Sequence, residues 1–334
     1  MLAKFLESIG AVERNILNKC GSNFLILMYH RVIPYKEAEP GLQAGMYVEP
    51  ETFTMHIHYL KKHFKIIPLN DILNCIDNLS KKRNNIPICM LTFDDGWQDF
   101  YKYSYPILET HRVPATVFLP TKYISTGSRF WTDQVANIFT QEQNNKCQKY
   151  QKRFSNNNVV KKITGLEGRI ESKIERAIFI LKDYSDDEIS NILNEIKIEW
   201  GIDLILNERT FLNWEEVAEM AKSGLISFGS HTENHKMLTY LKNNDILEEL
   251  IKSKNKLISE NIVDKSFIPF CYPNGNYNDM VIRLVKEAGY HVAVTTENGW
   301  NNQNASLFNL QRIAIHQDIS STKEMFGCRI SNIF

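Results

Sequence analysis

The chain has 334 residues, of which 43% are hydrophobic and 23% charged. This balance is that of a globular protein with a sizeable core, and it excludes disordered and fibrous architectures. Lysine plus arginine and aspartate plus glutamate both number 39, so the formal net charge is zero. Without an excess of positive charge, we expect no bulk electrostatic binding of nucleic acid or of an anionic membrane.

The first twenty residues interleave charged side chains such as Lys4, Glu7 and Arg14 with apolar ones. A secretory signal needs an uninterrupted apolar stretch, so we expect a cytoplasmic protein. Apolar stretches such as residues 24–29 are much shorter than the ~18 residues that indicate a membrane span, so no transmembrane segment is expected. The six cysteines are scattered without a C-x-x-C pair. Their spacing favours reduced thiols and argues against a zinc site built on cysteine.

Short apolar runs alternate with helical patterns along the chain. The predicted strands are residues 24–29, 88–93, 115–119, 225–228, 267–272, 291–295 and 312–315. Helical patterns include the spacing of Phe53, Ile57, Leu60 and Phe64, and the run from Met280 to Ala288 that ends at Gly289. This alternation favours a parallel sheet in an α/β barrel or a doubly wound fold.

The alternation is interrupted between residues 141 and 210, where asparagine-rich sequence, including Asn144 and Asn145, precedes charged, helix-like segments. A (β/α) barrel typically needs about 250 residues, so the length accommodates one barrel with a helical insertion. We therefore expect a helical extension at 1–23, a barrel domain at 24–320 with the insertion at about 141–210, and a C-terminal tail at 321–334.

Two adjacent carboxylates, Asp94 and Asp95, directly follow the predicted strand 88–93 and precede Gly96 and Trp97. The carboxyl ends of parallel strands meet at one face of the sheet, so both side chains would reach the same active-site face. The alternative is a turn followed by a helix N-cap, in which aspartate and glycine are common.

Two histidines, His231 and His235, follow the predicted strand 225–228. At this spacing we expect them on one face of a helical turn, close enough to share one metal ion. Two imidazoles and one carboxylate leave coordination positions open for water and substrate, as a hydrolytic metal site requires. The alternative is a chance H-x-x-x-H on a solvated helix. We discount a second pair, His56 and His58, because residues two apart on a helix point in different directions.

The sequences TFDDG and SHTENH, in this order and each after a strand, resemble the NodB-type polysaccharide deacetylases, carbohydrate esterase family 4. Matching segments also include LMYHRV at 27–32, the helix that begins with NWEEV at 213–217, YPNG at 272–275 and QRIAIH at 311–316. The resemblance extends from about residue 24 to 318, excluding the insertion. It implies a distorted (β/α) barrel of about seven parallel strands, the NodB homology fold, and metal-dependent removal of acetyl groups from sugars.

The resemblance also implies roles for individual residues. Asp95, His231 and His235 would hold one divalent metal ion, usually Zn²⁺, for which Co²⁺ or a similar ion can substitute. Asp94 would be the general base, because the carboxylate that binds the metal has its lone pairs committed.

The third motif of the family commonly has an arginine that pairs with the base, and Cys271 stands at that position here. Loss of this cation would raise the pKa of Asp94, and we expect Arg312 on a late strand to compensate. The oxyanion donor of the family is a backbone N–H, which Asn274 can supply.

The remaining candidates are weaker matches. His316 ends the last predicted strand, and we expect it to be the general acid that protonates the leaving amine; the alternative is a surface histidine near Asp318. His30 and Tyr272 are expected to line the substrate pocket. Trp131 and Asp133 fall roughly where the fourth motif of the family contributes an aromatic residue and an aspartate.

We therefore expect a metal-dependent hydrolase that removes N-acetyl or other acyl groups from a carbohydrate, either an N-acetylated sugar or a glycan precursor. One alternative is a catalytically silent carbohydrate-binding member of the same fold, suggested by the missing arginine. Another is a deformylase or amidase that acts on a lipid-linked amino sugar or on a non-sugar amide.

Overall fold

The chain folds into two units in the computed structural model, which describes residues 10–37, 44–81, 86–143, 156–202 and 209–332 together with positions 3 and 42. The barrel unit comprises Met1–Lys36, Ala44–Thr126 and Phe211–Phe334, and the helical unit comprises Glu37–Gln43 and Gly127–Thr210. All the strands named below belong to the barrel unit. No helix among the described residues is both long and apolar enough to cross a bilayer.

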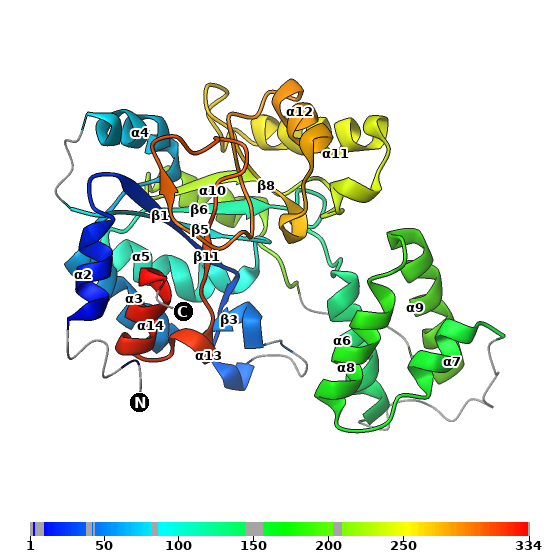
Figure 1. Ribbon diagram of the computed structural model, residues 1–334. Helices are drawn as coiled ribbons and strands as arrows, with labels where there is room; N and C mark the ends of the chain where they lie inside the picture. Colours follow the sequence, from blue (N-terminus) through cyan, green and yellow to red (C-terminus); the bar gives the residue numbers. More distant parts are fainter. Residues whose placement is uncertain are drawn as a thin grey trace. The chain divides into compact units, whose positions relative to one another are not determined.

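The main sheet is a curled path of seven strands, shown at the centre of Figure 1. In spatial order these are β10 (Asn301–Asn302), β1 (Asn23–Tyr29), β5 (Ile88–Phe93), β6 (Ala115–Leu119), β7 (Ile226–Ser230), β8 (Pro269–Cys271) and β9 (Val292–Val294). Two short strands join it, β4 (Lys65–Ile66) beside β5 and β11 (Ile313–Ala314) beside β1. Only the β1–β10 pair in this described sheet is antiparallel. A separate parallel ribbon consists of β2 (Arg31–Val32) and β3 (Tyr47–Val48).

The predicted fold class is confirmed, because the sheet is curled and mostly parallel, as in a distorted barrel. Each of the seven predicted strands is present, with boundaries that shift by a few residues. β5 is buried along its whole length. Strands covered on both faces have continuous apolar runs, which is why sequence periodicity identified them. The two-residue strands β2, β3, β4 and β10 carry no such pattern and were not predicted.

The segment from Leu307 to Ile315 links the two ends of this sheet. On one side, the N–H of Ala293 donates to the carbonyl of Leu307 at 2.7 Å and that of Thr295 to Leu310 at 2.9 Å. On the other side, the N–H of Ile315 donates to the carbonyl of Met28 in β1 at 2.9 Å. The segment therefore lies between β9 and β1 and brings its side chains to the ends of the central strands.

Helices surround the curled sheet (Figure 1). They are α2 (Ala11–Asn18), α3 (Pro50–His63), α4 (Ile72–Ser80), α5 (Tyr105–His111), α10 (Trp214–Lys222), α11 (Asn243–Ser259), α12 (Asp279–Glu287), α13 (Gln317–Ser320) and α14 (Lys323–Ser331). Shorter helical turns are η1 (Tyr35–Glu37), η2 (Ala44–Met46), η3 (Leu69–Asp71), η4 (Phe100–Ser104), η5 (Leu238–Tyr240) and η6 (Pro273–Gly275). The predicted helices at 53–64 and 280–288 correspond to α3 and α12, and Gly289 follows α12 with φ +82°.

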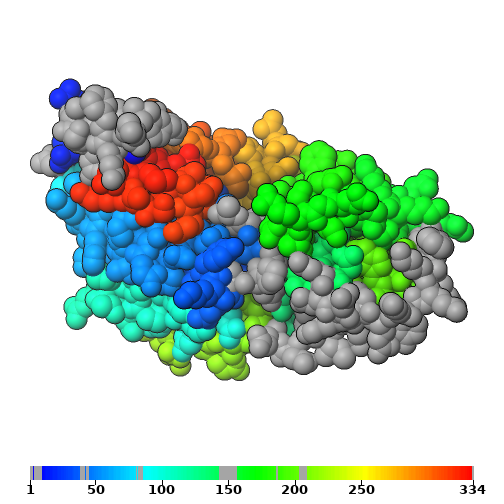
Figure 2. Space-filling model, turned by 90° about the horizontal axis from the view of Figure 1, so that it is seen from below, coloured from blue at the N-terminus to red at the C-terminus, as the bar shows by residue number. Residues whose placement is uncertain are grey.

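The two ends of the described chain pack together. Helix α14 lies in the segment expected to be a tail, and its Phe326, Cys328 and Ile330 are buried. It contacts α2 and α3, and Asn15 of α2 donates from Nδ2 to the carbonyl of Ser331 at 2.9 Å. In the space-filling view the C-terminal helices (red) cover part of the blue N-terminal third (Figure 2). These contacts make α14 part of the barrel unit.

The helical unit contains α6 (Trp131–Gln143), α7 (Asn158–Thr164), α8 (Ile170–Leu181) and α9 (Asp186–Trp200). Helices α7, α8 and α9 lie in the stretch expected to form the insertion, and the second segment of the helical unit starts at Gly127. The reason is that Val135, Ile138 and Phe139 of α6 share one apolar core with α8 and α9. The predicted asparagine-rich start of the insertion, Asn144 and Asn145, lies outside the described residues.

His56 joins α3 to the chain's C-terminal helices. Its ring is buried and stacks on Phe326 with centroids 3.9 Å apart. Its Nε2 lies 2.7 Å from the carbonyl of Ser320, and its Nδ1 lies 3.3 Å from the hydroxyl of Tyr29. A neutral imidazole satisfies both contacts, because Nε2–H donates while Nδ1 accepts. His58, two residues later, is exposed, so the two histidines point apart as predicted.

We predict that His56 makes stability depend on pH. Burial lowers the pKa of His56 from 6.5 to about 4. Between these values the unfolded chain binds a proton that the folded chain does not, so the free energy of unfolding should decrease as pH falls from 6.5 to 4, by at most about 3 kcal/mol. Urea unfolding measured at pH 7 and at pH 5 gives the decrease in the free energy of unfolding between the two pH values. This decrease should be smaller in His56→Gln than in the wild type. The matched variant His58→Gln should keep the wild-type decrease, and equal decreases in all three proteins would contradict the prediction.

Candidate functional site

One carboxylate and two imidazoles meet where β5 and β7 end. Asp95 Oδ1 lies 3.3 Å from His235 Nε2 and 3.4 Å from His231 Nε2. The three potential ligand atoms lie within 4.8 Å of one another. Asp95 and His231 are buried, whereas 21% of the His235 side chain is exposed. We call Asp95, His231 and His235 the ligand trio; it has one side open to solvent.

The two histidines lie on a loop, so the expected helical turn is wrong. β7 ends at Ser230, and the residues that follow are irregular. Thr232 has φ +66° and His235 has φ +57°. These left-handed residues reverse the chain direction and bring the two imidazole centroids to 4.7 Å from each other. His231 and His235 are four residues apart, and their rings come together because the loop turns between them. No helix is involved.

Hydrogen bonds orient two members of the ligand trio. His231 Nδ1 donates to the carbonyl of Cys271 at 2.8 Å, which fixes the ring with Nε2 directed toward Asp95. Asp95 has φ +74°, and its Oδ2 accepts a hydrogen bond from Trp97 Nε1 at 3.0 Å. This indole in turn lies under the Arg31 guanidinium, 4.5 Å from the ring centroid.

Arg31 is itself fixed by a buried carboxylate. Its Nε donates to Asp99 Oδ2 at 2.7 Å, and Asp99 Oδ1 also accepts from the backbone N–H of Val32 at 3.2 Å. Arg31 and Asp99 were not singled out from the sequence. The segments LMYHRV and TFDDGWQD contain them, and the contact of Arg31 with Trp97 connects this pair to the ligand trio.

The electrostatics of the ligand trio favour a bound cation. Burial by itself would raise the pKa of Asp95, but the hydrogen bonds from His231 and His235 hold it well below its ordinary value. Burial would lower the pKa of His231, but Cys271 and Asp95 raise it well above its ordinary value. The trio therefore stabilises a positive charge between its ligand atoms. One carboxylate oxygen and two imidazole nitrogens are a donor set that suits Zn²⁺ with an open coordination position.

Asp94 is held by a bidentate contact with Arg312. Arg312 Nη1 donates to Asp94 Oδ1 and Nη2 to Oδ2, both at 2.7 Å. The guanidinium also donates to the carbonyl of Thr295 at 2.7 Å, to Thr92 Oγ1 at 3.0 Å and to Cys271 Sγ at 3.2 Å. Burial by itself would raise the pKa of Asp94, but the Arg312 cation holds it below its ordinary value. Asp94 is therefore ionised, although both partners are buried.

The thiol of Cys271 stands at the sequence position where the family's third motif commonly has an arginine. Cys271 ends β8, is fully buried, and places its Sγ 3.5 Å from Asp94 Oδ2. Arg312 approaches the same carboxylate from the segment that links β9 to β1. A cation thus stands beside Asp94, supplied by the residue that directly precedes β11.

The other predicted residues occupy varied surroundings. His30 follows β1 and is half-buried; burial lowers its pKa, and the nearby carboxylates of Asp95 and Asp94 oppose this change. Asn274 is exposed in η6 with φ +54°. Tyr272 is fully buried and donates its hydroxyl to the carbonyl of Phe308 at 2.9 Å. Its side chain therefore supports the barrel wall, and the expected contact with substrate is not retained for it.

Three predicted residues, His316, Trp131 and Asp133, lie near the beginnings of two helices. His316 caps the start of α13, is half-buried, and its Nδ1 contacts the carboxylate of the exposed Asp318. Trp131 and Asp133 lie in the first turn of α6 in the helical unit, where Trp131 packs against that unit's core. The contact with Asp318 is the one that the surface alternative for His316 expects, and the general-acid role of His316 stays a prediction.

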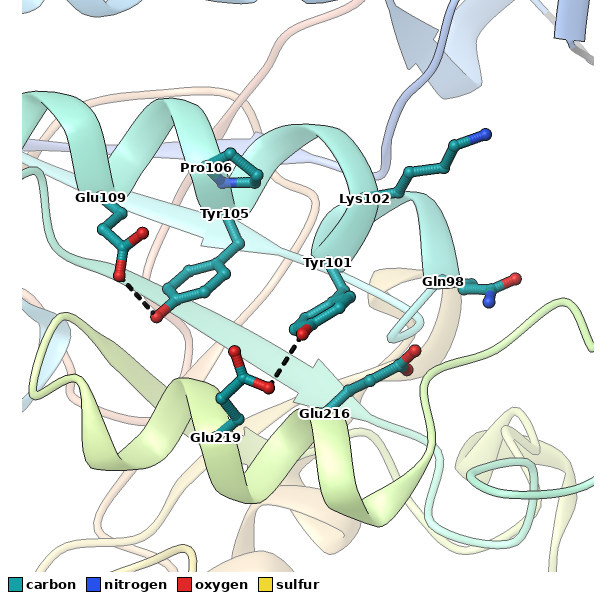
Figure 3. Close-up of a pocket in the computed structure, with 8 residues that line it drawn as sticks. All are labelled: Gln98, Tyr101, Lys102, Tyr105, Pro106, Glu109, Glu216 and Glu219. Carbon is teal, nitrogen blue, oxygen red and sulfur yellow. Dashed lines mark hydrogen bonds between the residues drawn. The ribbon is translucent and has the colours of Figure 1, made fainter.

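A groove on the outside of the barrel unit has a volume of about 480 Å³ and lies between η4–α5 and α10. Figure 3 shows Tyr101 and Tyr105 side by side, extending from η4–α5 toward α10. Tyr101 donates to Glu219 Oε2 at 2.8 Å, and Tyr105 donates to Glu109 Oε1 at 3.0 Å. The first of these bonds connects η4 to α10, the helix that precedes β7. The groove contains no member of the ligand trio, and we assign it a structural role.

Comparison with known proteins gives a consistent result. The polysaccharide deacetylase family model matches residues 81–165 and 170–293. A protein of Bacillus subtilis (strain 168) that carries the name polysaccharide deacetylase YxkH is 28% identical over 128 residues, which are 38% of this chain and 44% of that relative. The match thus spans less than half of the relative's length.

Two solved structures share the fold at low sequence identity. The Streptococcus pyogenes deacetylase PplD, in complex with acetate, has a TM-score of 0.56 at 20% identity over 89% of this chain and 94% of that one. IcaB from Ammonifex degensii has a TM-score of 0.56 at 14% identity over 92% of this chain and 97% of that one. These similarities show a common architecture.

We predict that removing the Arg312 cation will strongly destabilise the protein. Arg312→Met leaves Asp94 buried without a neutralising cation, which should lower the free energy of unfolding by about 3–5 kcal/mol. The double variant Arg312→Met/Asp94→Asn should recover part of this loss. Arg283→Met is the matched control, because Arg283 is exposed and paired with Glu287 on the surface, and it should cost less than about 1 kcal/mol. Urea unfolding at pH 7 measures all three, and equal losses for the two arginines would contradict the prediction.

Proposed function

Since the chain belongs to the polysaccharide deacetylase family, we propose that it is a metal-dependent hydrolase that removes an N-acetyl or other acyl group from a sugar or glycan precursor. The observation that carries this proposal is the ligand trio beside an ionised carboxylate, Asp94. The family implies a carbohydrate substrate. The acyl group and the particular sugar are left to experiment.

Asp95, His231 and His235 would hold one divalent ion, for which Zn²⁺ is the proposed occupant and Co²⁺ a substitute. When bound, such an ion polarises an acyl carbonyl and lowers the pKa of water. The chain's part is to fix the three ligand atoms. The hydrogen bonds from His231 to the Cys271 carbonyl and from Trp97 to Asp95 support this role.

Asp94 is the proposed general base, which takes the proton from the attacking water. It is adjacent to Asp95 in the chain, and its low pKa keeps it able to accept a proton at neutral pH. Arg312 acts through Asp94 and is a positioning residue: its two parallel hydrogen bonds fix the carboxylate plane. Loss of this cation should raise the pKa of Asp94 and move the acidic limb of the kcat/KM profile to higher pH.

Asn274 would supply the oxyanion contact through its backbone N–H. Its left-handed φ of 54° is one that asparagine tolerates better than most residues. Asn274→Gly keeps both the N–H and this conformation, so kcat should change little. A loss of about 10²-fold would show that the side chain itself participates.

The activity is tested with a panel of acylated substrates. Purified protein loaded with Zn²⁺ or Co²⁺ is incubated with N-acetylated sugars, glycan oligomers, nucleotide sugars, N-formylated and lipid-linked amino sugars, and non-sugar amides. Mass spectrometry then detects loss of an acyl group. Loss from an N-acetylated sugar supports the proposal, whereas loss only from a formylated or non-sugar amide supports the alternative hydrolase. Binding of glycan oligomers without any turnover would support the silent carbohydrate-binding alternative.

We predict that metal binding and proton transfer can be separated by mutation. His235→Ala removes one of three ligands and should abolish tight metal binding together with turnover. Asp94→Asn should retain about one metal ion per chain and lose turnover, because the amide cannot accept the proton. Metal content measured by mass spectrometry and kcat measured on the same samples distinguish the two. Full metal content in His235→Ala, or wild-type kcat in Asp94→Asn, would contradict the assignment.

We also predict that His316 protonates the leaving amine. An amine leaving a tetrahedral intermediate must gain a proton, and imidazole, with an ordinary pKa near 6.5, can supply it. His316→Ala should lower kcat by about 10²- to 10⁴-fold and remove the basic limb of the pH–rate profile, with metal content unchanged. Asp318→Asn is the companion variant, because Asp318 contacts the imidazole. Wild-type turnover in His316→Ala would transfer the role to another group, with His30 as the next candidate.

A further inference from the structure

The loop that carries the two histidines is held by a buried carboxylate outside the ligand trio. Glu249 lies in α11 and is only 5% exposed. Its Oε2 accepts a hydrogen bond from the backbone N–H of Asn234 at 2.8 Å, and its Oε1 accepts one from Asn234 Nδ2 at 2.7 Å. Asn234 stands between His231 and His235 in the sequence. Glu249 thus holds the loop at the residue directly before one of its two histidines.

The same face of α11 holds the beginning of the loop. Ser253 lies four residues after Glu249, which places both on one side of the helix. Its hydroxyl lies 2.7 Å from the hydroxyl of Ser230, and Ser230 Oγ accepts from the backbone N–H of Thr232 at 3.2 Å. Helix α11 therefore contacts the loop at two points, before and after its turn at Glu233.

The hydrogen bonds from α11 offset the cost of an unfavourable backbone conformation in the loop. Thr232 and His235 both have positive φ, and a left-handed conformation costs a non-glycine residue roughly 1–2 kcal/mol. Such residues persist only where their surroundings determine the conformation. A buried carboxylate is also costly unless it is hydrogen-bonded, and the contacts with Asn234 supply those bonds to Glu249. The loop and the carboxylate therefore stabilise each other.

We propose that Glu249 is a positioning residue, which keeps the 231–235 loop in the conformation that presents both imidazoles to one metal ion. This role rests on the proposed metal site and concerns how tightly that site binds. Glu249 itself does not contact the ligand atoms through any hydrogen bond found among the described residues. Its effect reaches His235 through the backbone of Asn234.

The first test compares Glu249→Gln with Glu248→Gln. The glutamine at 249 keeps the size of the side chain but turns one acceptor into a donor facing Asn234. Glu248 is its exposed neighbour on α11 and pairs with Lys252. Competition with a chromophoric chelator measures the Kd for zinc. We expect Glu249→Gln to bind zinc about 10- to 100-fold more weakly, the range typical of losing a contact that orients a ligand, and Glu248→Gln to bind as the wild type does.

Thermal unfolding of the metal-free variants shows whether Glu249→Gln remains folded. If it does not, Asn234→Ala provides the second variant, because it removes the Nδ2 contact and leaves the backbone contact in place. It should weaken zinc binding by a smaller factor. Where both variants fold, their combined effect should be less than additive, since both remove the same interaction.

The visible spectrum of the cobalt-loaded protein adds a structural readout. Wild type and Glu248→Gln should share one spectrum, and Glu249→Gln should show altered d–d bands because the imidazoles are displaced. An unchanged zinc Kd and an unchanged cobalt spectrum in folded Glu249→Gln would overturn the positioning role alone. A wild-type protein that binds neither metal would instead overturn the metal-dependent function on which the inference rests.

Discussion

The buried ion pair between Asp94 and Arg312 is the interaction on which the site depends. It joins the end of β5 to the segment that links β9 with β1. The same contact therefore connects parts of the curled sheet and fixes the orientation of the Asp94 carboxylate. Two charges without access to water are favourable only when their hydrogen bonds are complete. Arg312 meets this condition, because carbonyl, hydroxyl, thiol and carboxylate groups surround its donors.

The adjacent carboxylates have different partners, and this difference sets their roles. Asp94 faces a permanent cation, which keeps it ionised and oriented. Asp95 faces the imidazoles of His231 and His235, with which it forms the proposed metal site. Adjacent residues reach such different surroundings because Asp95 takes a left-handed backbone conformation where β5 ends. One strand end therefore carries both the proposed base and a proposed metal ligand.

Supporting contacts reach the ligand trio from three directions. Trp97 binds Asp95 beneath Arg31, the Cys271 carbonyl orients His231, and Glu249 holds the backbone before His235. Each contact starts from a different element of the barrel unit. This arrangement holds a loop with two left-handed residues in the conformation that the proposed metal site needs. Such a loop has no regular hydrogen bonding of its own, so the surrounding helices and strands must supply it.

Local patterns in the sequence determined the buried strands, the main helices and the residue types that meet at the strand ends. Apolar periodicity and motif spacing involve neighbours in the chain, which is why β5, α3 and the two motifs could be predicted. Arg312 was expected beside Asp94 because the motif arginine is missing, but its bidentate geometry across 218 residues comes only from the tertiary structure. The contact between Asn234 and Glu249 crosses from a loop to a helix and was not predicted. The left-handed turns at Thr232 and His235 also escaped prediction, because their conformation is stabilised by α11 and not by the residues themselves. Contacts of this kind leave no periodic pattern, since folding brings together side chains that have no fixed spacing along the chain.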